Sequence, residues 1–295
     1  AYRAASIDLM SSGRNIAARL NIDFPSAGFV QGNIGIVNAF GPATAAQISG
    51  ELRAEVKRLD FIPALIPEIA EPKGEMKGVV RISGSIAQPS LTIHSELKGE
   101  ARLPRPGLHL HQIIGRVTGN TTNGLAYTIS ANSGPGTLKA AGHVDFSNTS
   151  SWHTQLGITG TNFQIVNLPE ATALVSPDLA LDISAQLIRV DGTVGITEAK
   201  LNLQRLENSI TPSQDILILD DESANTARVM PPLSSIIRID LGEQIRVEGF
   251  GLNARLHGNL ALIDEPNQPT RGVGQIMIAE GSYNLEKLYG AFAGL

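Results

Sequence analysis

Few residues of this sequence are spaced for chemistry, and the clearest pair is His109 and His111. If they lie on a strand, their spacing of two residues places both imidazoles on one face, which would make half of a metal site. The sequence places no carboxylate or third histidine beside them to complete the site. We therefore interpret the pair as part of a polar strand face and predict no metal.

The other candidates for chemistry are equally isolated. Asp220, Asp221 and Glu222 form an acidic run without the ligand spacing of an EF-hand, which is more typical of a solvated loop than of a calcium site. The glycine-rich stretch 115–124 has no following helix to bind phosphate. The dispersed Asp and Glu residues could pair as glycosidase acids, but the sequence selects no pair. No serine nucleophile elbow, His-Glu-x-x-His motif or Walker loop is present, so we expect no enzyme and no cofactor.

Composition narrows the class of protein. The 295 residues are 42% hydrophobic, enough for a large buried surface in one or two domains. Only 4% are aromatic, while 30 are Gly and 16 are Pro, which favours many short strands rich in Ile, Leu and Val. A net charge of −5 argues against nucleic acid as a partner. The absence of cysteine excludes thiolate chemistry and is compatible with the periplasm, although many cytosolic proteins also lack it.

The elements that carry these residues are predicted from a period-2 alternation along almost the whole chain. It predicts an all-β fold: a long antiparallel sheet curled into a taco-like groove with an apolar interior. Gly84 and Gly258 interrupt strands at similar places and are expected to mark the bends. Alternation alone does not distinguish an open groove from a closed sandwich. The predicted lining residues share the apolar parity: Ile82, Leu91, Ile93, Leu125, Ile129, Leu138, Val144, Leu181, Ile183, Leu201, Leu203, Ile237, Ile239, Leu252, Leu256, Leu260, Leu262, Ile276 and Ile278.

Two segments break this period. Within residues 55–74 the apolar side chains follow helical spacing, and Pro63 and Pro67 would kink or divide the helix. We predict one or two short helices near 55–70, acting either as a cap on the sheet or as a gate over the groove. The gate residues would be Leu59, Ile62, Leu65, Ile66 and Ile69. Residues 205–235 are predicted to be irregular loops around a short strand.

The motif order resembles the C-terminal region of the TamB family, periplasmic relatives of the AsmA-like bridge proteins. The resemblance covers roughly residues 50–285. It is carried by Glu248-Gly249-Phe250-Gly251-Leu252, Leu256-x-Gly258-x-Leu260, Gly274-x-Ile276-x-Ile278 and Gly281-x-Tyr283. It implies a curled sheet spanning the periplasm of a Gram-negative bacterium, an inner-membrane anchor outside this sequence, and a TamA-like outer-membrane partner. The family usually continues with a glycine-rich strand pair where this sequence ends, so the resemblance leads us to expect docking to that partner through regions outside this sequence.

Two functions fit this interpretation of residues 1–295 as a single elongated β-groove fragment of a longer protein. The first is a periplasmic bridge segment whose groove carries phospholipid acyl chains between the inner and outer membranes. The alternative is a chaperone or scaffold that assembles outer-membrane β-barrels by β-augmentation. A surface β-solenoid is a weaker third reading, because the turns lack a fixed short repeat.

Gly249-Phe250-Gly251 makes a specific prediction about this fold. Ile245 and Val247 have odd numbers, whereas Leu252, Leu256 and Leu260 have even numbers. A turn or bulge at the glycines must therefore return the apolar side chains to the same face.

Overall fold

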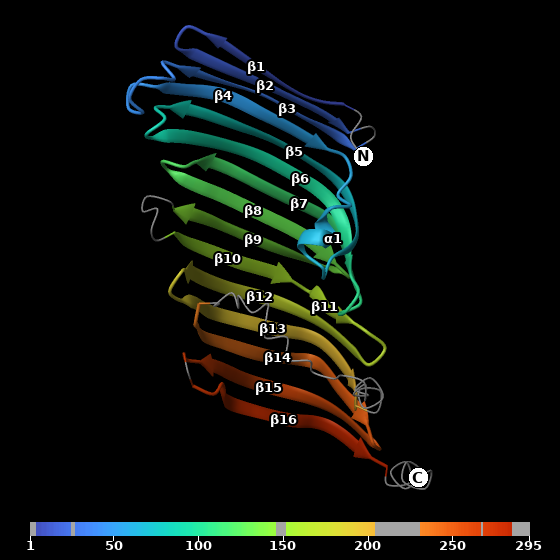
Figure 1. Ribbon diagram of the computed structural model, residues 1–295. Helices are drawn as coiled ribbons and strands as arrows, with labels where there is room; N and C mark the ends of the chain where they lie inside the picture. Colours follow the sequence, from blue (N-terminus) through green and yellow to red (C-terminus); the bar gives the residue numbers. More distant parts are fainter. Residues whose placement is uncertain (1–3, 25–26, 146–151, 204–230, 267, 285–295) are drawn as a thin grey trace, which may run out of the picture. The chain divides into compact units, whose positions relative to one another are not determined.

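Strands form nearly all of the secondary structure in the computed structural model, which describes residues 4–24, 27–145, 152–203, 231–266 and 268–284 (Figure 1). The chain divides into two compact units, Ala1–Thr159 and Gly160–Leu295. The prediction of an all-β fold built on an open, curled sheet is confirmed. The interpretation of residues 1–295 as one elongated fragment of a longer protein stays a prediction.

The first unit follows the meander that the alternation predicts. Strands β1 to β9 pair with their chain neighbours, always antiparallel, and β10 follows β9 in the sheet. Short turns between strands permit this order. Its strands are β1 (Ala4–Ser12), β2 (Asn15–Phe24), β3 (Gly28–Val37), β4 (Gln47–Val56), β5 (Ala70–Gly84), β6 (Pro89–Leu103), β7 (Leu108–Asn120), β8 (Gly124–Ser133), β9 (Gly136–Asp145) and β10 (His153–Thr161).

The second unit contains one pairing that the sequence did not predict. Strands β13 and β14 are parallel, whereas its other described pairs are antiparallel. Parallel neighbours need a crossover of a dozen or more residues, and residues 203–232 supply that length between them. Its strands are β11 (Phe163–Asn167), β12 (Ala171–Ser184), β13 (Ile188–Asn202), β14 (Leu233–Gly249), β15 (Leu252–Asp264) and β16 (Arg271–Tyr283).

The predicted irregular segment 205–235 overlaps this crossover. Residues 205–230, including the acidic run at 220–222, lie outside the described residues. The last three residues of the predicted loop, 233–235, begin β14 instead.

The predicted helical segment contains one helix, α1 (Ile62–Leu65), which lies beside the sheet of the first unit (Figure 1). Pro63 stands near its start, where a missing N–H costs nothing, and Pro67 follows its end. The helix is shorter than the apolar spacing suggested, because Val56 belongs to β4 and residues from Ala70 onward belong to β5. The expectation of one or two short helices near 55–70 is met by this one.

Irregular registers in the first unit fall on β5 and β7, the two strands that flank β6. On β5 the register shifts between Ala70 and Lys73, and on β7 between His111 and Ile114. Each shift contains a non-glycine residue in the left-handed region, Glu71 (φ 47°) and Gln112 (φ 51°). Bulges bend a strand and increase its twist. Their alignment explains why these strands curve along their length (Figure 1).

The second unit has a corresponding line of irregularities. The register shifts between Ile196 and Glu198 on β13, between Leu241 and Ile245 on β14, and between Ile278 and Glu280 on β16. Gly258 (φ 140°) pairs with Leu241 at this line, as the interrupted-strand pattern predicts. Gly84 (φ 101°) does not mark a bend within its strand, because it is the last residue of β5 and pairs with Pro89 at the hairpin.

Candidate functional site

One face of the first unit's sheet is apolar, because the pairing registers place the apolar residues of neighbouring strands opposite one another. Ile82 lies opposite Leu91, Leu125 opposite Val144, and Gly115 opposite Ile129. Paired residues point to the same side of a sheet, and alternate residues along each strand share that side. All predicted lining residues of this unit therefore lie on one face: Ile82, Leu91, Ile93, Leu125, Ile129, Leu138 and Val144.

The second unit has an apolar face built in the same way. Ile237 lies opposite Leu262, Ile239 opposite Leu260, and Leu181 opposite Val190. Leu203 follows the end of β13, two residues beyond Leu201. The registers place the remaining predicted lining residues of this unit on this face: Leu181, Ile183, Leu201, Ile237, Ile239, Leu252, Leu256, Leu260, Leu262, Ile276 and Ile278.

These faces are open to solvent to a degree unusual for apolar strands. Ile129, Ile276 and Ile278 expose 47%, 53% and 62% of their surface. The described strands form no second sheet that could pack on them. Buried apolar side chains are few in the described part of the chain: Ala46, Leu59, Ala101, Leu108, Phe163, Val175, Ile245 and Ala254. The described part of each unit is thus an open, one-layer sheet and not a closed sandwich, in which both inner faces would be dry.

The hairpin at Gly249-Phe250-Gly251 keeps the apolar face of the second unit on one side. Gly249 pairs with Leu252, so that Phe250 (φ 49°) and Gly251 (φ 85°) form a two-residue turn with both φ angles positive. Beyond it Ile245 lies opposite Leu256. The predicted turn is confirmed.

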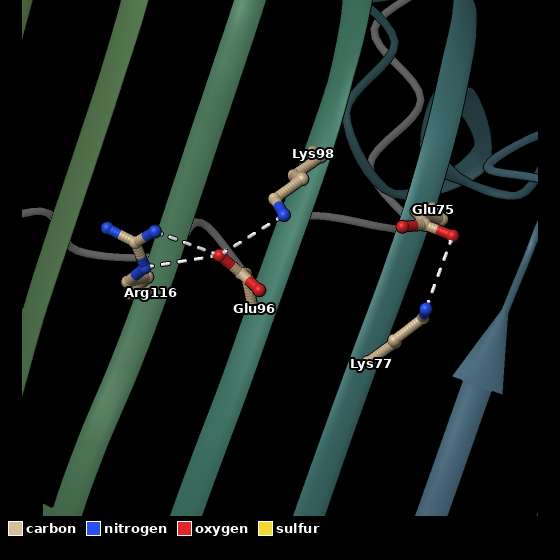
Figure 2. A network of polar contacts seen from close by, with 5 residues as sticks. All are labelled: Glu75, Lys77, Glu96, Lys98 and Arg116. Atoms are coloured by element: carbon tan, nitrogen blue, oxygen red, sulfur yellow. Dashed lines mark hydrogen bonds and ion pairs between the residues drawn. The ribbon is translucent and has the colours of Figure 1, made fainter.

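The opposite, polar face of the first unit carries a ladder of charges across neighbouring strands (Figure 2). Arg116 donates to Glu96 at 3.0 Å, and Lys98 lies 3.7 Å from the same carboxylate. The Arg116 hydrogen bond holds the pKa of Glu96 below its usual range. Arg81 lies 2.8 Å from Glu51 and lowers the pKa of that carboxyl in the same way. These exposed pairs favour one register but contribute little stability each.

A third carboxyl group with a lowered pKa lies at the end of the second unit's apolar face. Thr270 and Ser235 both donate hydrogen bonds to Asp264, and these hold its pKa below the usual range. Because Asp264 closes β15 and Thr270 precedes β16, the contacts fix the loop between the two strands.

The predicted gate residues divide into two groups. Leu59 is 3% exposed and anchors the segment that carries α1, whereas Leu65 and Ile66 are 74% and 46% exposed. Ile62 and Ile69 are half-buried. The helix contacts β5. The segment is therefore held at one buried point and presents apolar side chains at its tip, together with Phe61.

Among the residues that the structure describes, no three His, Asp or Glu side chains come together in a group that could hold a metal ion. His109 and His111 do share a strand face, with ring centroids 6.1 Å apart. Glu100 approaches this pair: its Oε2 lies 3.8 Å from the His109 Nε2, and its Oε1 lies 3.2 Å from the Lys73 Nζ. Sequence reasoning did not find Glu100, because this residue approaches the histidines only through the register shift between β6 and β7.

Comparison with known protein families identifies the family of this chain. The model of the TamB C-terminal domain matches residues 127–292, more than half of the chain. The chain belongs to the TamB family. Its resemblance to TamB was expected over residues 50–285, and the match covers the later part of that range and extends beyond it.

A curated relative shows similarity to TamB over most of the chain. It is the translocation and assembly module subunit TamB of Haemophilus influenzae, 23% identical over 288 residues. The alignment covers 91% of this chain but 21% of the relative, so the chain spans about a fifth of that protein's length. No solved structure gave a significant match. In the residues that the structure describes, no helix is long and apolar enough to span a membrane.

Proposed function

We propose that this chain is a periplasmic segment of a TamB-type translocation and assembly module in a Gram-negative bacterium, and that its apolar sheet faces carry phospholipid acyl chains between the inner and outer membranes. The relative's name supports the module assignment. In this proposal the parent protein is anchored in the inner membrane outside this sequence and works with a TamA-like outer-membrane β-barrel. No cofactor or catalytic residue is needed, because the guest is bound and not transformed.

The single observation that carries the proposal is an apolar face that is continuous within each unit and only partly buried. Soluble proteins seldom leave contiguous apolar surface of this kind uncovered unless something binds it. A chain of methylene groups suits it better than a compact ligand, since Leu256, Leu260 and Leu262 repeat along β15 with no polar group to orient a guest. Burial contributes about 0.8 kcal/mol per CH₂, so ~16 carbons could gain on the order of 10 kcal/mol before ordering costs.

In this proposal the segment with α1 acts either as a gate over the apolar face or as a cap on the strands. Its buried anchor, Leu59, holds it against the first unit, while the exposed Leu65 and Ile66 are free to contact an acyl chain. As a gate it would move when lipid passes. As a cap it would only cover the end of the strands.

A second candidate function, a scaffold for outer-membrane β-barrel assembly, is favoured by β16. Every residue of this strand is exposed, and it pairs with β15 on one side alone within the described sheet. An open edge presents unpaired N–H and C=O groups, which an incoming strand can use for β-augmentation.

Native mass spectrometry of the protein purified from a Gram-negative host tests the lipid proposal. We expect masses that exceed the protein by one or more glycerophospholipids, and extraction should identify them. Leu256→Arg should abolish the added mass with the fold retained. Asn259→Arg, on the polar face of the same strand, is the matched control and should keep it. Lipid-free wild-type protein would contradict the proposal and leave the scaffold function as the better account.

A further inference from the structure

Three cations lie side by side on the polar face of the second unit. Lys200 of β13 is directly opposite Arg246 of β14, which is directly opposite Arg255 of β15. Neighbouring strands are about 4.8 Å apart, so the three side chains share one short row. Like charges in directly opposite positions destabilise a sheet. An arrangement of this kind therefore needs a compensating negative charge.

The polar face of the first unit shows how such positions are otherwise filled. There Lys77 lies opposite Glu96, and Glu96 also accepts from Arg116 (Figure 2). Glu51 compensates Arg53 and Arg81 in the same manner. Cations on that face alternate with carboxylates, and in the second unit the row of three cations breaks this rule.

Local carboxylates compensate the row only in part. Lys200 lies 3.7 Å from Glu248, and the Nη2 of Arg255 donates to Glu280 at 2.7 Å. The Nη1 of Arg255 reaches the Glu243 carbonyl at 3.4 Å, and its Nε is buried without a partner. Arg246 makes no ion pair with any residue that the structure describes. Two guanidinium groups therefore retain donors for a further anion.

A shallow cavity lies where these donors converge. Its volume is about 280 Å³, and it is lined by Arg246, Asn253, Arg255, Glu280, Gly281 and Ser282. This space is many times the roughly 10–15 Å³ that a cavity needs to hold one water, so an oxyanion fits. Asn253 and Ser282 add a neutral amide and a hydroxyl donor beside the two arginines.

We propose that this cavity binds a phosphate group, with Arg246 and Arg255 as its principal ligands and Asn253 and Ser282 as additional donors. Guanidinium forks match the oxygens of phosphate and form strong charge-assisted hydrogen bonds with it. The phosphate could belong to a glycerophosphodiester headgroup or be free inorganic phosphate. The site stands on the face opposite the acyl-chain surface and does not depend on the proposed lipid function.

Binding of inorganic phosphate and of glycerophosphoglycerol to the whole chain, measured by calorimetry at low ionic strength, tests this site. Arg246→Gln should weaken binding by about tenfold or more, because a charge-assisted hydrogen bond contributes roughly 1.5–3 kcal/mol. Arg116→Gln, on the polar face of the first unit, should bind as the wild type does. Tighter binding of the diester would identify a lipid headgroup as the source, and tighter binding of inorganic phosphate would identify the free ion.

The melting temperature is a second readout, which distinguishes lost binding from a folding defect. Phosphate should raise the melting temperature of the wild type and of Arg116→Gln, because a ligand of the native state stabilises it, but should not raise that of Arg246→Gln. No binding by the wild type, or equal binding by Arg246→Gln and the wild type, would overturn the proposal. Either result would leave the detection of lipid by mass spectrometry unchanged, so the phosphate proposal and the lipid proposal can fail separately.

Discussion

Ile245 of β14 lies directly opposite Leu256 of β15, and both belong to the apolar face of the second unit. Their numbers differ in parity, so this pairing requires the two-residue turn at Phe250 and Gly251. A turn one residue longer or shorter would direct one strand's leucines to the polar face. The apolar face on β14 and β15 therefore depends on a short hairpin that contains none of the predicted lining residues.

Gly251→Ala tests this hairpin. The φ of Gly251 is 85°, and an added Cβ would lie 2.3 Å from the Asn284 carbonyl oxygen. We expect the free energy of unfolding to fall by about 1–3 kcal/mol in urea titrations. Gly272→Ala is the control, because its Cβ would make only ordinary contacts, with Leu260 Cδ1 at 3.5 Å and Leu262 Cδ2 at 3.9 Å. Equal losses in both variants would contradict the account.

Ile245→Ala and Leu260→Ala should separate the buried part of the apolar face from its open part. Ile245 is 6% exposed, and truncating such a side chain typically costs about 2–5 kcal/mol. Leu260 is half-buried on an uncovered face, so we expect a loss of roughly 1 kcal/mol or less. If thermal and urea unfolding give Leu260→Ala the larger loss, that face is covered by protein.

Substitutions in the α1 segment should distinguish a gate from a cap. Leu59→Ala removes the buried anchor, and Leu65→Ser changes only an exposed side chain. A gate predicts that Leu59→Ala raises the amount of co-purified phospholipid while the far-ultraviolet circular dichroism of the strands is retained. Leu65→Ser should leave stability within about 0.5 kcal/mol of the wild type. Loss of strand structure in Leu59→Ala would indicate a cap.

The charge ladder predicts a specific acid sensitivity. The folded-state pKa values of Glu51 and Glu96 are lowered from 4.5, so their stabilisation is present above that pH and is lost as the pH falls through the folded values. Between about pH 6 and pH 3, the urea midpoint of the wild type should fall further than that of Glu51→Gln/Glu96→Gln. High salt should reduce the difference, because these pairs are exposed. Identical pH profiles would show that the ladder does not stabilise the fold.

The sequence predicts most of the local structure because alternation records which side chains share a face. The same-face grouping of Leu252, Leu256 and Leu260 follows from period 2 alone. The need for a turn at Gly249-Phe250-Gly251 follows from the change of parity. These predictions depend on residues near one another in the chain, where sterics and burial act directly.

The features that sequence reasoning missed depend on distant residues. The parallel pairing of β13 and β14 is invisible to alternation, which is the same for either strand direction. Bulges at Glu71 and Gln112 occur at residues with no glycine signal. The proposed phosphate site was missed for the same reason, because Arg246 and Arg255 meet only through the register of two strands.

Site-specific photocrosslinking in cells tests the central claim, that the open apolar face binds acyl chains, most directly. A photoreactive amino acid at Leu256 or Leu260 should capture phospholipid, which radiolabelling of lipids would detect on the purified protein. The same probe at Asn259, on the polar face between them, should capture none. Equal labelling at all three positions, or none at Leu256 and Leu260, would contradict an acyl-chain surface on this sheet.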